Sequence, residues 1–150
     1  MRNNKTRELS NSGFSLVEML IVIVVAGLLM AMALPKLRNT LAQRDVNSAR
    51  AAVANMYARA RINALQTRKS TTINFSSTDT WVTVPITGGL DTIGAVAQLA
   101  TLYGVSVNAS VASITVLPTG LSNMGSTATI TVTRSGKSDS VMISGYGRLK

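Results

Sequence analysis

The sequence predicts an α+β fold in which a long N-terminal helix packs on a small antiparallel β-sheet head. Three observations predict it: a continuous apolar run from residue 14 to 34, an alanine-rich segment with helical periodicity up to about residue 69, and alternating apolar and polar residues over much of 70–150. Periods of about 3.6 and 2 residues distinguish helix from strand. With 150 residues, the chain has room for one modest domain beside the apolar helix.

The apolar run, Phe14 to Leu34, contains only two polar side chains, those of Ser15 and Glu18. As a helix it would reach about 31 Å at ~1.5 Å per residue, close to the ~30 Å hydrocarbon core of a bilayer. Nothing in the remaining sequence can cover this run completely in water. We therefore predict that residues 14–35 form a transmembrane helix.

Glu18 is the one acid in this run, and a carboxylate in lipid is unfavourable unless it faces a partner or a polar path. One interpretation is that Glu18 snorkels or takes up a proton near the helix end. The other is that it awaits a positively charged partner. No Lys, Arg or His lies between Phe14 and Pro35, so that partner must come from another chain or from a new N-terminus.

The residues before the apolar run favour a new N-terminus. Residues 1–13 carry three basic side chains and one acid. A secretory signal peptide is cut after its apolar region, at small residues, whereas here the small residue Gly13 comes before that region. Cleavage at Gly13 would free the amine of Phe14 and leave the apolar helix on the mature protein.

The motif G-F-S-L-V-E at 13–18, followed by an apolar run, resembles the processing motif of type IV pilins and of type II secretion pseudopilins. In that family a prepilin peptidase cuts after the glycine and methylates the new first residue, and a glutamate at the fifth mature position faces a neighbouring subunit's amine. The resemblance places these roles on Gly13, Phe14 and Glu18. It makes 1–13 a cleaved leader peptide, and it makes Gly27 and Pro35 helix-weakening positions.

The segment 36–69 is rich in alanine and contains no glycine or proline, which favours continuation of the helix. Apolar residues recur there at spacings of three and four, which predicts one buried stripe. The stripe consists of Val46, Ala49, Val53, Met56, Ala60 and Ala64. Arg50, Arg61 and Arg68 share another side of the helix. They are interpreted either as a solvated basic face or as a strip that meets phosphates or acids of neighbouring subunits.

Period-two patterns predict antiparallel strands in the head, with one face on a core and the other in water. The predicted strands are 71–76 and 80–85 as a hairpin, then 104–109 and 112–117, and finally 127–133 and 140–144 as the most strongly marked hairpin. Residues 90–102 are expected to form a short helix or an ordered loop. The single tryptophan, Trp81, is expected to pack in the core or against the helix.

The head resembles, more weakly, that of GspH/FimT-type minor pilins and pseudopilins. The similarity lies in A-R-I-N-A at 60–64, in the strand pair that contains Trp81, and in G-R at 147–148. The chain departs from the many pilins that hold their C-terminal region with a disulfide, because it has no cysteine.

A net charge of +9 favours salt-sensitive attraction to phosphate. Arg134 and Lys137 at the last turn, with Arg148 and Lys150 at the C-terminus, are the candidate DNA-binding residues. The ending G-R-L-K is similar to the basic C-terminal motif of DNA-binding FimT-like pilins, with lysine at the last position where an arginine is expected. Lysine lacks the planar fork of arginine. The alternative is a basic tail that only aids solubility.

The composition argues against an enzyme. Cysteine and histidine are both absent, so the usual nucleophile–base pairs and zinc sites are excluded, and the few acids are scattered along the sequence. We expect no catalytic, cofactor-binding or metal-binding residues.

These features predict a single-pass protein of the bacterial inner membrane, with residues 70–150 as a periplasmic head, that later joins a pilus or pseudopilus. The basic leader agrees with this orientation under the positive-inside rule, whereas Lys36 and Arg38 count against it. The resemblance implies four partners: other pilin or pseudopilin subunits, the prepilin peptidase/methylase, the inner-membrane assembly platform and membrane lipid. DNA is the partner in the alternative role, on a competence pilus.

Overall fold

The computed structural model describes residues 14–86 and 88–150. Its first element is a single long helix, α1 (Leu16–Thr67), which confirms the prediction of one continuous N-terminal helix. The chain divides into two compact units between Arg38 and Asn39, so α1 contributes its first part to one unit and the rest to the other.

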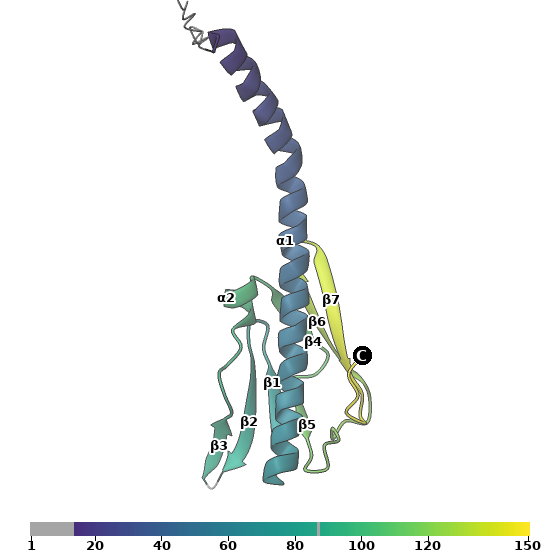
Figure 1. Ribbon diagram of the computed structural model, residues 1–150. Helices are drawn as coiled ribbons and strands as arrows, with labels where there is room; N and C mark the ends of the chain where they lie inside the picture. Colours follow the sequence, from purple (N-terminus) through teal and green to yellow (C-terminus); the bar gives the residue numbers. More distant parts are fainter. Residues whose placement is uncertain (1–13, 87) are drawn as a thin grey trace, which may run out of the picture. The chain divides into compact units, whose positions relative to one another are not determined.

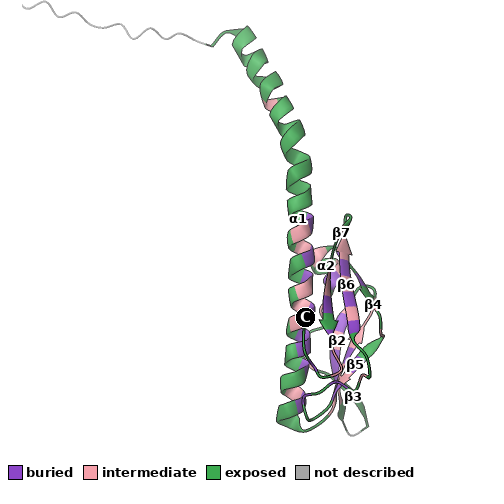
Figure 2. Cartoon of the chain, turned by 90° about the vertical axis from the view of Figure 1, so that its right-hand side faces the viewer, coloured by how far each residue is buried: buried purple, intermediate pink, exposed green. Residues whose placement is uncertain are grey.

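From Leu16 to Arg38, α1 is exposed almost throughout, although most of its side chains there are apolar (Figure 2). Among the described residues, α1 is the one helix whose length and composition suit a membrane span. Pro35 lies inside the helix without ending it. Since burial of apolar surface stabilises by about 25 cal/mol per Å², this part of the helix is strongly favoured to be covered by lipid or protein.

From Asn39 to Thr67, α1 is amphipathic and belongs to the second unit. All six residues of the predicted apolar stripe are buried, which confirms that prediction. Ala42 and Tyr57 are buried in addition. Figure 2 shows that the buried positions of α1 lie on the side of the helix that faces the strands.

The described strands form two antiparallel sheets, which lie behind this part of α1 in the view of Figure 1. One is four-stranded with the order β3-β2-β1-β5, and the other is three-stranded with the order β4-β6-β7. The strands are β1 (Thr71–Phe75), β2 (Thr80–Ile86), β3 (Gly89–Thr92), β4 (Ser106–Ala109), β5 (Ser113–Val116), β6 (Ala128–Arg134) and β7 (Lys137–Ile143). A short helix, α2 (Leu99–Tyr103), connects β3 to β4.

Both sheets contribute one face to the core. Along β6, Ala128, Ile130 and Val132 are buried, while the threonines between them are more exposed, because successive side chains of a strand point to opposite faces. The four-stranded sheet adds Ile73 of β1 and Ile114 of β5 to the same cluster. The sheets therefore use the period-two pattern as predicted, and α1 supplies the period-3.6 stripe that covers them.

The structure refines two connections. The expected short helix is confined to α2, because Leu90 to Thr92 belong to β3 and pair with β2. The last turn is tighter than predicted: Ser135 and Gly136 alone join β6 to β7. Both have φ above zero, as a two-residue hairpin of this kind requires, so β7 already begins at Lys137.

The expectation for Trp81 is wrong. Thr80 and Val82 of β2 are buried, and Trp81 lies between them on the opposite face of the sheet, half-buried and across from Asn74 of β1. The alternation of a strand permits only one set of side chains to face the core, and here that set excludes the tryptophan.

Candidate functional site

Glu18 lies in the first turn of α1. Ser15 directly precedes the helix, and its carbonyl oxygen accepts the N–H of Met19 at 3.2 Å. Ser15 and Glu18 therefore have the spacing of a capping box, and a carboxylate at a helix N-terminus is favoured by the helix dipole. No ion pair of Glu18 occurs among the described residues, and both Glu18 and Phe14 are exposed. The carboxylate is thus open to a partner outside the described chain.

The predicted cleavage site, Gly13, lies outside the described residues. Gly27 and Pro35, the predicted helix-weakening positions, both lie inside an unbroken α1. A Cβ added to Gly27 would meet nothing within 4 Å, so packing within the described chain does not require glycine there, although glycine adds backbone freedom. Pro35 has no N–H and cannot donate the usual helical hydrogen bond. Their role in loosening the helix stays a prediction.

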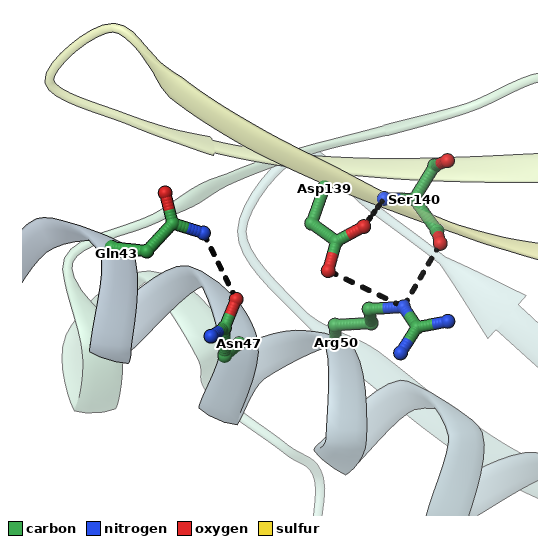
Figure 3. A network of polar contacts seen from close by, with 5 residues as sticks. All are labelled: Gln43, Asn47, Arg50, Asp139 and Ser140. Atoms are coloured by element: carbon green, nitrogen blue, oxygen red, sulfur yellow. Dashed lines mark hydrogen bonds and ion pairs between the residues drawn. The ribbon is translucent and has the colours of Figure 1, made fainter.

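Arg50 links α1 to strand β7 (Figure 3). Its Nε donates to the carbonyl oxygen of Ser140 at 3.0 Å and lies 3.4 Å from Oδ2 of Asp139. Oδ1 of Asp139 accepts the N–H of Ser140 at 2.7 Å. In the same view, Nε2 of Gln43 donates to Oδ1 of Asn47, one turn further along α1. Arg50 therefore already has a carboxylate partner in its own chain.

The three arginines predicted to share one side of the helix do not form one surface. Arg50 is paired with Asp139. Nη1 of Arg61 donates to the carbonyl oxygen of Gly147 at 3.4 Å. Arg68 follows the end of α1 and has a φ of 54°, so it has left the helical path. The prediction of one basic face along the helix is therefore wrong for Arg68, and the contact with neighbouring subunits or phosphates stays a prediction.

Arg134 at the end of β6 is held on two sides. Its Nη1 donates to Oδ2 of Asp45 on α1 and to the carbonyl oxygen of Tyr103 at the end of α2. The guanidinium also lies against Gly104, where an added Cβ would come 3.2 Å from Cζ of Arg134. Arg134 therefore ties the β6–β7 hairpin to both helices, and its charge is matched by Asp45.

The four predicted DNA-binding residues lie at the two ends of this hairpin. Arg134 and Lys137 flank the turn, whereas the C-terminal tail pairs with the far end of β7, where the N–H of Lys150 donates to the carbonyl oxygen of Met142 at 2.9 Å. At ~3.3 Å per strand residue, these ends are separated by about 17 Å. The structure thus places Arg148 and Lys150 together, apart from Arg134 and Lys137.

The tail covers Tyr57, which the sequence analysis did not single out. Tyr57 is buried, and its hydroxyl has no hydrogen-bond partner in the part of the chain that the structure describes. Burial raises the pKa of Tyr57 above its ordinary value, and the positive charge of Arg61 opposes that rise.

Gly147 makes this covering possible. A Cβ at Gly147 would lie 2.9 Å from the hydroxyl oxygen of Tyr57 and 3.0 Å from the carbonyl oxygen of Gly120, and its φ is +73°. The glycine of the C-terminal G-R-L-K therefore serves close packing. That glycine was the one sequence signal for the contact, since nothing local marks Tyr57 as its partner.

Within residues 14–86 and 88–150, no three His, Cys, Asp or Glu side chains form a group that could hold a metal ion. Two of the acids in the head, Asp45 and Asp139, are engaged in the ion pairs described above. The features that point to a function are therefore the N-terminal motif, the exposed apolar helix and the fold of the head.

Residues 9–34 match the family described as the prokaryotic N-terminal methylation motif. In structure, the chain is similar to two crystal forms of the type IV minor pilin FimU from Pseudomonas aeruginosa strain PAO1. The first aligns with a TM-score of 0.59 and 16% identity over 71% of this chain and 87% of that chain. The second aligns with a TM-score of 0.55 and 16% identity over 69% and 90%.

The chain carries the prokaryotic N-terminal methylation motif, and its fold is similar to that of a type IV minor pilin. The match at 9–34 contains Glu18 and most of the exposed apolar part of α1, and the likeness to FimU concerns the fold. No curated protein matches the chain by sequence. The predicted N-terminal motif and the predicted α+β architecture, a long helix on small antiparallel sheets, are both confirmed.

Proposed function

We propose that this pilin-like chain is a minor pilin or pseudopilin that is cleaved after Gly13, methylated on Phe14 and assembled into a filament through its N-terminal helix. Before assembly, residues 14–35 hold it in the bacterial inner membrane, and residues 70–150 form a head on the periplasmic side. Residues 36–69 carry the helix from the membrane segment into that head. Its role is assembly rather than chemistry.

The observation that carries the proposal is the exposed apolar surface of Leu16–Arg38 with an unpaired Glu18 at its start. Lipid covers that surface in the membrane, and neighbouring helices cover it in a filament. A carboxylate buried without a partner costs several kcal/mol. The freed amine of Phe14 in a neighbouring subunit supplies the opposite charge, and cleavage ahead of the apolar run is what leaves amine, acid and apolar helix on one mature segment.

The type IV pilus is the machine that we favour. Its support is the fold likeness to FimU, a type IV minor pilin. The type II secretion pseudopilus is the alternative, because its subunits carry the same kind of processing motif. The genes beside this one separate the two: pilus genes indicate a pilus subunit, and secretion genes indicate a pseudopilin.

Glu18→Ala tests the proposal in cells that assemble the filament. We expect normal processing but at least about tenfold less incorporation, because the loss of a partly desolvated ion pair exceeds about 1.4 kcal/mol. Incorporation is measured by immunoblotting sheared filaments against total protein. Glu18→Asp keeps the charge and should retain part of the incorporation, and Ser15→Ala should retain nearly all of it. Normal incorporation of Glu18→Ala would refute the proposal.

DNA binding on a competence pilus is the second candidate. It is favoured by two exposed cations, Arg148 and Lys150, on a tail where Arg61 and Arg148 line the same hollow. A gel shift with the mature chain in detergent tests it. Arg148→Ala and Lys150→Ala should each weaken binding and reduce its salt dependence, whereas Lys137→Ala at the other end of the hairpin should have little effect. Unchanged affinity in both tail variants would exclude the tail as the DNA site.

A further inference from the structure

The outer face of α1 in the second unit carries a second periodic pattern, distinct from the buried stripe. Its positions follow one another at alternating spacings of three and four residues, which places them on one side of the helix. They are Leu41, Arg44, Ser48, Ala51, Asn55, Ala58, Ile62 and Leu65. All eight are exposed. We call this set the outer seam.

The outer seam lies on the side of α1 opposite the core. Nine residues separate buried Val53 from Ile62, and nine separate buried Met56 from Leu65. Nine residues correspond to about 2.5 turns of an α-helix, so each pair points in opposite directions. The outward side of a surface helix is ordinarily polar. Here Ile62 and Leu65 are 54% and 49% exposed, and Leu41 at the start of the seam is 45% exposed.

Two hollows flank the seam. One is a groove of about 770 Å³ between α1 and the segment 93–103, and its lining includes Ala51, Asn55 and Ile62 of the seam. The other, of about 390 Å³, lies against the C-terminal tail and is lined by Ala58 and again by Ile62. A ridge with a hollow on each side accepts the two rows of side chains that a second helix presents when its knobs enter holes.

The charges along this face have one sign. Arg44 belongs to the seam. Arg59 follows Ala58 in the sequence, and Arg61 precedes Ile62. The described part of the chain offers none of the three a carboxylate partner, because its ion pairs are Arg50–Asp139 and Arg134–Asp45. A helix that covers the seam therefore has to supply the negative charge.

We propose that the outer seam docks one α-helix of a different protein chain, a helix with an apolar 3.5-residue repeat and acidic residues along both edges of it. A second copy packed parallel and in register would set Arg44 against Arg44, which is unfavourable. A wholly apolar helix would bury Arg44 and Asn55 without partners, which is also unfavourable. The seam from Leu41 to Leu65 spans about 36 Å of helix, enough for three heptads of contact. This inference rests on residues of the second unit, 39–150, and does not require the proposed filament role.

A pair of synthetic helical peptides tests the proposal with the full chain in detergent micelles. Both peptides carry the same leucine and alanine repeat; one has glutamate and the other lysine at the edge positions. Binding is followed by fluorescence anisotropy of the labelled peptide. We expect the glutamate peptide to bind at least about tenfold more tightly than the lysine peptide, and its binding to weaken as salt is raised.

Two variants locate the binding. Ile62→Ser combined with Leu65→Ser should weaken the glutamate peptide by at least about tenfold, since about 1.4 kcal/mol of lost contact is sufficient. Leu90→Ser, which removes an equally exposed apolar side chain on β3, is the matched control and should leave binding unchanged. Arg44→Glu combined with Arg59→Glu should reverse the preference toward the lysine peptide.

Equal affinity for the two peptides, absence of binding, or binding that survives the Ile62 and Leu65 changes would each overturn the proposal. Self-association of the chain that is lost in the Ile62→Ser and Leu65→Ser variant would overturn it as well, because the seam would then belong to a second copy. None of these results bears on Glu18, so the proposed function and this inference fail separately.

Discussion

The two parts of α1 belong to one continuous helix, but their side chains differ in polarity and in burial. From Leu16 to Arg38 almost every side chain is apolar or small and none is buried. From Asn39 to Thr67 the helix buries a single stripe against two sheets, and polar residues occupy much of the rest. The same backbone conformation therefore carries two different surfaces, and only the distribution of side chains differs.

This difference shows where each part obtains its stability. The second part is held by its own chain: Val53 and Tyr57 lie in the core, and Arg50 pairs with Asp139 at its edge. The first part contributes no residue to that core, and its apolar side chains are exposed.

The strongest test of this difference is to make the same substitution in both parts of α1. Val53→Ala in the buried stripe should lower the free energy of unfolding of the head by about 2.5 kcal/mol, from lost apolar burial and the cavity left behind. Val24→Ala, in the exposed part, should leave it unchanged. Denaturation of the full chain in detergent, followed through Trp81 fluorescence, measures both. A similar loss in both variants would contradict the distinction.

A second test concerns the C-terminal tail, which covers Tyr57 of α1. Gly147→Ala should destabilise the head by about 2 kcal/mol, because a positive φ is strained for alanine and the new Cβ meets Tyr57 and Gly120. Gly136 has a φ of +76° with nothing within 4 Å of a Cβ, so Gly136→Ala isolates the backbone strain and should cost about half as much. Equal losses from the two variants would mean that the tail does not pack on Tyr57.

The ion pair at the edge of the helix should matter less. Asp139→Asn should cost about 0.5 kcal/mol, since both partners are more than a third exposed and solvent screens them. Salt should reduce the difference between variant and parent. Asp91→Asn on β3, where no ion pair is formed within the described residues, provides the control. A loss of several kcal/mol would show that Arg50 and Asp139 are shielded from solvent.

Tyr57→Phe should have the smallest effect at neutral pH, below about 0.5 kcal/mol, because the hydroxyl has no protein partner to lose among the described residues. Its effect should appear at high pH. Burial raises the pKa of folded Tyr57, so the unfolded chain loses its proton first and stability falls as pH rises past the ordinary tyrosine value of about 10. The phenylalanine variant should lose less stability there than the parent. An identical alkaline decline in both would contradict the buried position.

Much of this molecule could be predicted from local pattern alone. The alternation in β6 and the helical stripe around Val53 each fix which side chains face the core, because burial and period have to agree. The motif at 13–18 was visible for the same reason: the charge, small residue and apolar run stand next to one another.

The rest depends on contacts between residues far apart in sequence. Nothing near Arg134 in the sequence marks Asp45 as its partner. Arg134 was therefore predicted to bind DNA, although its side chain is paired within the chain. The strand around Trp81 alternates in a way that allows either face to be buried, and a shift of one residue reverses the outcome. The arginines of α1 were grouped by spacing, but the strands and the tail beside the helix determine which of them is already occupied.

The central claim is that the chain is processed ahead of its apolar helix, so that a freed amine is available to neutralise Glu18 in a neighbouring subunit. Mass spectrometry of the protein isolated from its native membrane tests this most directly. The account predicts a mature chain that begins with methylated Phe14. A chain that still begins with Met1, or one cut after the apolar run, would contradict it.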